Sequence, residues 1–337
     1  MDLSAGRNLL YYKRVYHIGT GKGGSMSEYI LNLLPLKEGE EALFEQAAAG
    51  ATHVWAERKS VTDEQYRQAT AILGWPVEED LKRCPDLKWV HCMWAGADMY
   101  LKPGVLPDGV MLTKSSGSNS QSVAEHMLAS LLALCRKLPQ CRDAQRQHVW
   151  CKIPKARTLS GATVLVVGAG HIGSVFAALC RGLGAHTVGL KRTVTGPVDG
   201  FDEVYPVERL DEWLPRADVA ALCLPHDEST VGLMDRKRLE AMKDDAMLVN
   251  AGRGSVLDQE GLVELLRAGK FWGVALDVTD PEPLPEDHPL WDAPNLLLTP
   301  HVAGGLRLDI TRDLCIQMAL ENLEHYMKGE PLDQRIR

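Results

Sequence analysis

Three polar side chains each follow an apolar run in the second half of the sequence. Arg253 follows AMLVN, Glu282 follows WGVALDV, and His301 follows NLLLT. Runs of this kind indicate buried strands of a parallel sheet, and ligands bind such sheets at the edge where the strands end. We therefore expect three separate loops to bring the arginine, the carboxylate and the histidine to one crevice.

These residue types together suit the reduction of a 2-keto acid, which needs a hydride on the keto carbon and a proton on its oxygen. Histidine exchanges protons near neutral pH. A neighbouring carboxylate stabilises the charged imidazole, and a guanidinium binds a carboxylate through two hydrogen bonds. Each residue alone also fits an ordinary role: a surface ion pair for Arg253, a solvated side chain for Glu282, and a packed or capping one for His301. Their joint spacing favours catalysis.

A glycine-rich turn follows the apolar run TVLVV and opens a helix-like segment. Its glycines are Gly168, Gly170 and Gly173. Such glycines allow a tight turn, a close backbone approach to a pyrophosphate, and close packing of helix on strand. Free N–H groups where the helix begins would hold the phosphate charge. The same spacing occurs at 19–24 (GTGKGG), but no second strand follows it, so we interpret it as a loop of the other domain.

The end of the next apolar run indicates which dinucleotide is bound. NAD-binding domains carry Asp or Glu there, on the ribose 2′-hydroxyl, whereas this chain has Lys191, Arg192 and Thr193. Two cations and a hydroxyl suit a 2′-phosphate. We therefore favour NADP(H) as cofactor. NAD(H) remains possible, because the Lys–Arg pair also fits a solvated strand end.

The segments that must position these residues alternate between strand-like and helix-like sequence. Six strand-like runs, mostly separated by helix-like segments, predict a doubly wound parallel sheet; they are 163–167, 187–190, 219–224, 246–250, 272–278 and 295–299. The first 120 residues alternate too, with predicted strands at 12–18, 52–56, 89–93 and 110–113 and predicted helices at 27–34, 40–49 and 63–73. Between the halves we expect a buried apolar helix over 122–138 and an irregular crossing over 140–159. An amphipathic helix over 308–327 should end at Gly329.

Charge and composition argue against several classes of protein. The 337 residues include 37 Lys and Arg and 45 Asp and Glu, so the net charge is −8. Nucleic-acid binders usually carry a basic face, so we expect no nucleic-acid partner. No run approaches the roughly 20 apolar residues of a membrane span, and the first residues lack the apolar core of a signal peptide. Eight cysteines without a CxxC pair indicate reduced thiols in a cytoplasmic protein without a metal centre.

Several segments together resemble the NAD(P)-dependent D-isomer-specific 2-hydroxyacid dehydrogenases. The resemblance covers about 120–305 and is looser before residue 90. The segments that carry it are VAEH (123–126), GAGHIG (168–173), CLPHDEST (223–230), LVNAGRGSVLDQEGLVELL (248–266), ALDVTDPEPLP (275–285) and HPLWDAPNLLLTPHVAG (288–304). It implies an oxidoreductase in which a Rossmann domain (122–300) is inserted in a smaller flavodoxin-like α/β substrate domain (1–121, completed by 301–337).

The resemblance also implies a role for each matching residue. His301 would be the acid/base, Glu282 its partner, and Arg253 the catalytic residue that binds the substrate carboxylate. A loop would hold that carboxylate through backbone N–H groups; its residues are Trp94, Ala95, Gly96 and Ala97. Residues implied to lie along the dinucleotide, from pyrophosphate to nicotinamide carboxamide, are His171, Ile172, Leu224, Pro225 and Asp277.

The family resemblance further implies a homodimer joined through the helix at 122–138. Trp150 would then reach the partner's cleft, unless it is a packed anchor of the crossing between domains. The expected substrate is a small 2-keto acid, with glyoxylate or hydroxypyruvate favoured, although Trp94 would also suit an aromatic or branched acid. Two alternatives stay open: a dinucleotide-dependent binding protein like the corepressors that resemble this family, and a dehydrogenase of a non-carboxylate acid such as phosphite.

Overall fold

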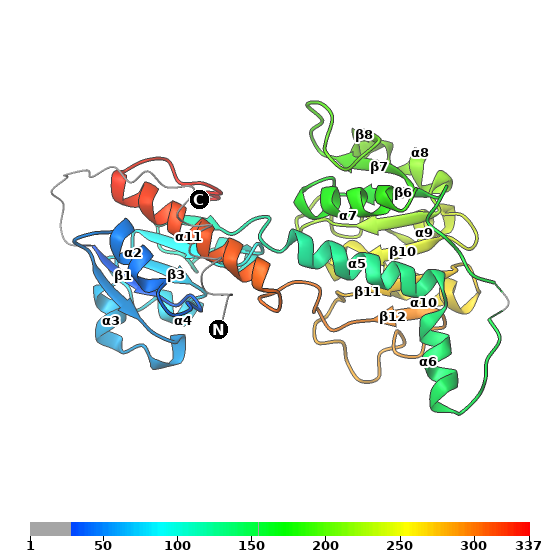
Figure 1. Cartoon of the computed structure of the whole chain (residues 1–337), viewed down its shortest axis with the longest axis horizontal. Helices are drawn as coiled ribbons and strands as arrows, with labels where there is room; N and C mark the ends of the chain where they lie inside the picture. The colour runs from blue at the N-terminus through cyan, green and yellow to red at the C-terminus, as the bar shows by residue number, and fades with distance from the viewer. Residues whose placement is uncertain (1–27, 154) are drawn as a thin grey trace, which may run out of the picture.

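The chain forms two lobes, each built around a parallel sheet (Figure 1). The computed structural model describes residues 28–153 and 155–337. The predicted strand at 12–18 and the glycine loop at 19–24 lie outside the described residues. Within those two ranges, no helix combines the length and the apolar character needed to cross a lipid bilayer.

The first lobe has a five-stranded sheet in the order β2-β1-β3-β4-β5, which is the flavodoxin-like order. Its strands are β1 (Tyr29–Asn32), β2 (Thr52–Trp55), β3 (Ala71–Gly74), β4 (Trp89–Cys92) and β5 (Met111–Lys114). Its helices are α2 (Glu41–Ala47), α3 (Asp63–Gln68) and α4 (Glu78–Leu81). The predicted strands that became β2, β4 and β5 are confirmed.

One predicted helix of this lobe is wrong, and a second is too long. Residues 27–34 contain β1 instead of a helix, and the helix predicted over 63–73 ends at Gln68, so that 71–74 form β3. β3 is buried along its whole length and β1 along most of it. Because strands covered on both faces lack the polar–apolar alternation of half-exposed strands, they resemble buried helices in sequence.

The second lobe has a seven-stranded sheet in the order β12-β11-β10-β9-β6-β7-β8. Its strands are β6 (Thr163–Val167), β7 (His186–Lys191), β8 (Glu203–Pro206), β9 (Val219–Leu222), β10 (Met247–Asn250), β11 (Gly273–Leu276) and β12 (Leu296–Leu298). All six predicted strands are confirmed. β8 was not predicted; it lies at one edge of this sheet and pairs with β7.

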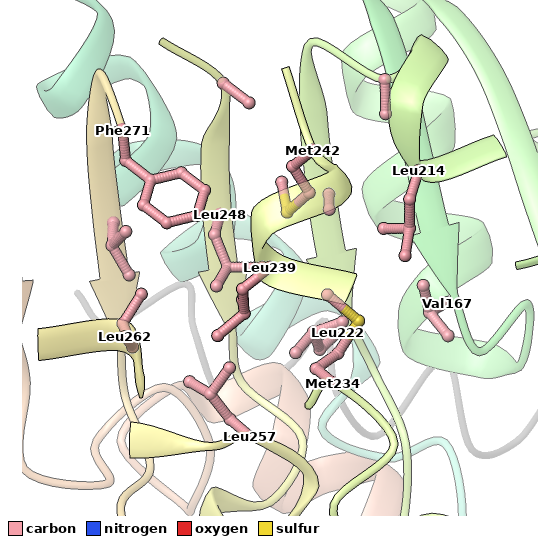
Figure 2. Close-up of a cluster of buried hydrophobic side chains, with 14 of the residues drawn as sticks. Val167, Leu214, Leu222, Met234, Leu239, Met242, Leu248, Leu257, Leu262 and Phe271 are labelled. Carbon is pink, nitrogen blue, oxygen red and sulfur yellow. The ribbon is translucent and has the colours of Figure 1, made fainter. Parts of the chain in front are cut away.

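Helices cover both faces of the second sheet. On one face lie α8 (Leu210–Trp213), α9 (Arg236–Ala241) and α10 (Gln259–Arg267), whose apolar side chains pack on the strands; Figure 2 shows side chains of α9 and α10 in this cluster. Leu239 and Leu262 from two of these helices meet Leu222 and Leu248 from two of the strands. The other face is covered by α5 (Ser120–Cys135) and α7 (His171–Gly182).

The apolar helix predicted over 122–138 ends at Cys135, and a second helix, α6 (Leu138–Arg146), follows it. Lys137 between them has a φ of 55°, in the left-handed region that breaks a helix. The prediction that 140–159 is irregular is therefore wrong for its first part. Figure 1 shows α6 projecting from the edge of the second lobe.

The last helix returns to the first lobe. α11 (Asp309–Lys328) ends at Gly329, whose φ is 68°, as expected for a helix C-terminus. Ile316 and Leu323 on this helix pack with Phe44 and Trp89 of the first lobe. This packing supports the proposal that 301–337 complete the substrate domain of 1–121, around a dinucleotide-binding domain at 122–300.

The two chain segments that connect the lobes touch each other. One precedes α5 and the other precedes α11 (Figure 1). The hydroxyl of Ser122, in the first turn of α5, donates to the carbonyl of Ala303 (2.8 Å). A Cβ placed on Gly304 would lie 3.1 Å from the side-chain nitrogen of Asn119. Both connections therefore pass through one small region.

His91 on β4 should make the protein sensitive to acid. Its fully buried ring bonds Thr113 Oγ1 (2.9 Å) and Ser115 Oγ (3.1 Å), and burial lowers the pKa of His91 to about 3. An unfolded histidine titrates near pH 6.5. Between these two pH values the unfolded chain binds a proton that the folded chain does not, so stability is lost as the pH falls. We expect this residue to lower the free energy of unfolding by up to about 1.4 kcal/mol per pH unit in that window.

Urea unfolding at several pH values, from neutral to about pH 5, tests this expectation. His91→Gln keeps a hydrogen-bond donor and an acceptor but cannot take up a proton near pH 6. The variant should therefore lose less stability per pH unit than the wild type. Parallel curves for the two proteins would show that His91 does not cause the acid sensitivity.

Candidate active site

A cleft of about 820 Å³ lies between the lobes and is lined by the loops that follow the strands of both sheets. From the first lobe come the turns after β3, β4 and β5, and from the second the turns after β6, β9, β10, β11 and β12. The predicted site residues that line it are Trp94, Ala95, Gly96, Gly168, Gly170, His171, Ile172, Gly173, Leu224, Pro225, Arg253, Asp277 and His301. As predicted, strands of the second sheet end at one crevice, which Arg253 and His301 line, whereas Glu282 is not among the lining residues.

His301 and Glu282 form the pair that the sequence predicted. Nδ1 of His301 lies 2.7 Å from Oε2 of Glu282. The other carboxylate oxygen, Oε1, accepts the N–H of Thr279 (3.0 Å). Nε2 of His301 has no hydrogen-bond partner among the described residues, and its ring lines the cleft. The ring is therefore held through one nitrogen, and the other is available to a ligand.

Asp277 holds the loop that carries His301. Its side chain is buried, and its carboxylate accepts the N–H groups of Val302 and Ala303 (2.9 Å each) and the hydroxyl of Thr299 (2.6 Å). The N–H of His301 in turn donates to the carbonyl of Asp277 (2.8 Å). No pattern in the sequence predicts these bonds. They show a positioning role, and the expected contact of Asp277 with a carboxamide stays a prediction.

Arg253 lies directly against the loop predicted to hold a substrate carboxylate. A Cβ placed on Gly96 would be only 2.7 Å from Nη2 of Arg253, so a side chain at 96 would displace the guanidinium. Nη1 donates to the carbonyl of Gly252 (2.8 Å), and Nη2 lies 3.4 Å from Oδ2 of Asp98. The structure therefore brings together the two groups expected to bind one carboxylate, although they come from different lobes.

The backbone of this loop offers free donors. No described residue accepts a hydrogen bond from the N–H groups of Ala95, Gly96 or Ala97. Ala97 is 1% exposed and does not line the cleft, so its side chain is part of the core below the loop. The predicted carboxylate site thus consists of Ala95 and Gly96 facing Arg253, with Trp94 beside them.

The glycine loop fits a bound pyrophosphate. Gly168 has a φ of 110°, and a Cβ there would lie 2.6 Å from the carbonyl oxygen of Cys223. A Cβ on Gly173 would lie 2.3 Å from the carbonyl oxygen of Gly168. Gly170 precedes the 12-residue helix α7 and has open space beside it. The first N–H groups of a helix have no partner within it, so this open helix start can receive phosphate oxygens.

The residues predicted to determine the preference for NADP(H) or NAD(H) lie at the end of β7. They are beside the glycine loop but do not line the cleft between the lobes. Gly168 donates its N–H to the carbonyl of Leu190 (3.0 Å), which places Lys191, Arg192 and Thr193 next to that loop. The side chain of Arg192 is 71% exposed and lies 2.7 Å from Oδ2 of Asp227. Binding of a 2′-phosphate by Lys191 and Arg192 stays a prediction.

The cleft also contains side chains that sequence reasoning missed. Trp75 follows β3 and meets Trp94 edge to face, with ring centroids 6.0 Å apart. The other charged or bulky residues missed are Lys114, Leu306 and Arg307. Trp75 was not predicted because the helix expected over 63–73 covers most of β3. A correct strand boundary would have placed Trp75 at the end of a strand.

Comparison with known proteins identifies the class to which this fold and cleft belong. A sequence model of the D-isomer specific 2-hydroxyacid dehydrogenase, NAD binding domain, matches residues 128–303. A structure of a D-isomer specific 2-hydroxyacid dehydrogenase family protein from Aeromonas salmonicida is 30% identical, with a TM-score of 0.82 over 92% of this chain and 99% of that one.

Two further structures were solved with dinucleotides bound. A D-isomer specific 2-hydroxyacid dehydrogenase from Xanthobacter autotrophicus Py2, in complex with NADPH and MES, is 28% identical, with a TM-score of 0.76 over 92% of this chain and 98% of that one. An NADPH-dependent glyoxylate/hydroxypyruvate reductase from Sinorhizobium meliloti, in complex with NADP and sulfate, is 25% identical, with a TM-score of 0.75 over the same shares.

The chain is an NAD(P)-dependent oxidoreductase acting on CH–OH donors. It belongs to the D-isomer specific 2-hydroxyacid dehydrogenase family, and residues 128–303 match the NAD-binding domain of that family.

Proposed function

We propose that this protein reduces a small 2-keto acid to the D-2-hydroxy acid, with NADPH as the favoured cofactor. One observation carries the proposal: His301, which Glu282 holds at 2.7 Å, lines the same cleft as Arg253 and Gly96, beside the glycine loop. A proton donor, a carboxylate-binding cation and free backbone donors thus surround one space. That set is what a 2-keto acid requires.

Each side chain would have a defined task. NADPH, when bound, supplies the hydride for the keto carbon. Arg253 and the N–H groups of the loop at Gly96 bind and orient the substrate carboxylate. His301 donates a proton from Nε2 to the keto oxygen, and Glu282 stabilises the ring while it is charged. Thr279 holds Glu282 in place through its N–H (3.0 Å).

Glyoxylate or hydroxypyruvate is the substrate we favour, because the Sinorhizobium neighbour is a reductase of these two acids. The two indoles of Trp75 and Trp94 line the cleft and would also contact a larger aromatic or branched side chain. Oxidation of NADPH, and separately of NADH, should be followed with glyoxylate, hydroxypyruvate, pyruvate, phenylpyruvate and 2-ketoisocaproate. Turnover of a small acid supports the proposal. No turnover of any of them, with dinucleotide binding intact, would contradict it and favour a corepressor-like or phosphite-oxidising protein.

The preference for NADP(H) is tested at the end of β7. The double variant Lys191→Ala with Arg192→Ala removes both cations that would face the 2′-phosphate. We expect the dissociation constant of NADPH to rise by about 10- to 100-fold, because charge-assisted hydrogen bonds are lost. NADH has no 2′-phosphate and is the internal control, with a change below about threefold. Equal losses for both dinucleotides in a fluorescence titration would contradict the assignment.

We also propose that the chain forms a homodimer in the cytoplasm. Apolar side chains are exposed on and beside the helices α5 and α6; they are Leu132, Leu138, Val149 and Trp150. Trp150 is 95% exposed, so it is not a packed anchor within its own chain. A second copy that covers this surface would bury it, and Trp150 is placed to reach that copy. All eight cysteines are unpaired, which fits a reducing compartment.

Light scattering after size exclusion tests the dimer. The wild type should have twice the 37.1 kDa mass of one chain. Leu138→Glu should shift the population toward monomer, because the side chain is 54% exposed in the single chain and a charge there opposes burial in an interface. A monomeric wild type, or a variant with an unchanged mass at low concentration, would contradict this interface.

A further inference from the structure

An ion pair joins the two loops on either side of the glycine loop. In the second sheet β6 lies between β7 and β9. Arg192 follows β7 and Asp227 follows β9, and Nη2 of the arginine lies 2.7 Å from Oδ2 of the aspartate. Between them, Gly168 bonds Leu190 on one side and abuts Cys223 on the other. The pair therefore spans the loop along which a dinucleotide would lie.

The two partners of this ion pair are held to different degrees. Oδ1 of Asp227 accepts the N–H of Ser229 (2.9 Å), and the N–H of Asp227 donates to the hydroxyl of Thr230 (3.0 Å). The hydroxyl of Ser229, then its backbone N–H and after them Arg192, lower the pKa of Asp227, which stays charged at neutral pH. Arg192 has no other hydrogen-bond or ion-pair partner among the described residues. The carboxylate is therefore fixed, whereas the guanidinium can move.

We propose that Asp227 limits the affinity for NADP(H) by competing with the 2′-phosphate for the guanidinium of Arg192. This inference rests on the proposed function, in which Arg192 binds that phosphate. Ion pairs between exposed side chains are weak, whereas a phosphate monoester carries nearly two negative charges and three strong acceptor oxygens. The phosphate therefore displaces Asp227, and breaking the ion pair reduces the net affinity. NAD(H) lacks the phosphate and leaves the pair intact, so Asp227 is a specificity-determining residue.

Asp227→Asn tests the competition without disturbing the loop. The amide oxygen can still accept the bonds from Ser229, but the charge that holds Arg192 is gone. Dissociation constants of NADPH and NADH should be measured by fluorescence titration without substrate. We expect NADPH to bind about threefold to tenfold more tightly and NADH to bind as before. The gain should shrink in about 0.5 M salt, which screens exposed charges.

Two control variants test whether the gain in NADPH affinity arises from the Arg192–Asp227 ion pair. When Arg192→Ala is combined with Asp227→Asn, most of the gain should disappear, because the competition needs the guanidinium. Asp211→Asn breaks another exposed arginine–aspartate pair, between Asp211 and Arg238 (2.7 Å) on α8 and α9. This matched variant should leave both dissociation constants unchanged.

Three outcomes would overturn the inference: unchanged NADPH affinity in Asp227→Asn, an undiminished gain without Arg192, or weaker binding of NADH. The last would show that Asp227 binds the ribose hydroxyl itself. A different result would contradict the proposed preference for NADP(H) itself. In that case the wild type binds NADPH no more tightly than NADH, and Lys191→Ala with Arg192→Ala changes neither constant.

Discussion

Replacing His301 with alanine should lower kcat by about 10²- to 10⁴-fold, the usual contribution of a positioned general acid. The loss should fall on kcat more than on KM, because the imidazole acts on the keto oxygen while Arg253 still binds the carboxylate. Cofactor affinity should be unchanged, since the glycine loop is intact. Steady-state kinetics together with NADPH titration of the same preparation measures both quantities.

The pair with Glu282 gives this prediction a second test. Glu282→Gln should lower kcat by less than the loss of His301, because the ring remains but its charged form is less stabilised. In the double variant the two losses should not add, since Glu282 acts through the histidine. A surface pair of the same chemistry, His186 Nε2 and Glu203 Oε1 at 2.9 Å, provides the matched control. It lies where β7 begins, at the opposite edge of the sheet, so His186→Ala should keep normal turnover. Near-normal turnover of His301→Ala would show that another group donates the proton.

The second large effect is expected at Arg253. Arg253→Ala should lower kcat/KM by about 10²- to 10³-fold, because two charge-assisted hydrogen bonds to the substrate carboxylate are lost at once. Unlike the change at His301, this one should raise KM and lower kcat together, since the substrate is both bound less well and oriented less well. The keto acid that gives the highest turnover with the wild type is the substrate to use.

Arg253→Lys separates charge from geometry. Lysine keeps the positive charge but not the planar fork, so its activity should lie between those of the wild type and the alanine variant. Arg236→Ala is a suitable control, since Arg236 is an exposed arginine on α9 with ion-pair partners of its own. If the activity of Arg253→Lys matched that of the wild type, positive charge alone would suffice. Bidentate hydrogen bonding to the carboxylate would then be excluded.

Much of the second lobe could be predicted from its sequence, and much of the first could not. Six of the seven strands of the second lobe lie in apolar runs that glycine or capping signals separate from the neighbouring helices, such as Asp258 at the start of α10, whose carboxylate accepts the N–H of Gly261 (2.9 Å). In the first lobe, β1 and β3 are four residues each, and both are buried among apolar neighbours. Such short segments carry no period, so helix and strand cannot be told apart.

The candidate site, too, could be predicted only in part from the sequence. Residues that directly follow predicted strands, such as Arg253 and His301, could be placed because parallel strands end at one edge. The contacts that hold them could not. Asp277 bonds the backbone of Val302 and Ala303, and Arg192 pairs with Asp227 across 35 positions of sequence. These bonds depend on the path of each loop, which no local pattern specifies.

The contact where the two connecting segments meet the second lobe has a consequence for how the lobes move. Because Ser122, in the first turn of α5, bonds Ala303 of the other connection, we expect the simplest relative motion to be rotation about a hinge beside that contact. Such a rotation would carry Gly96 away from Arg253, since these residues lie on different lobes. His301 and Glu282 both precede the hinge and would stay together. Opening would therefore release the carboxylate of the product while leaving the proton donor assembled for the next turnover.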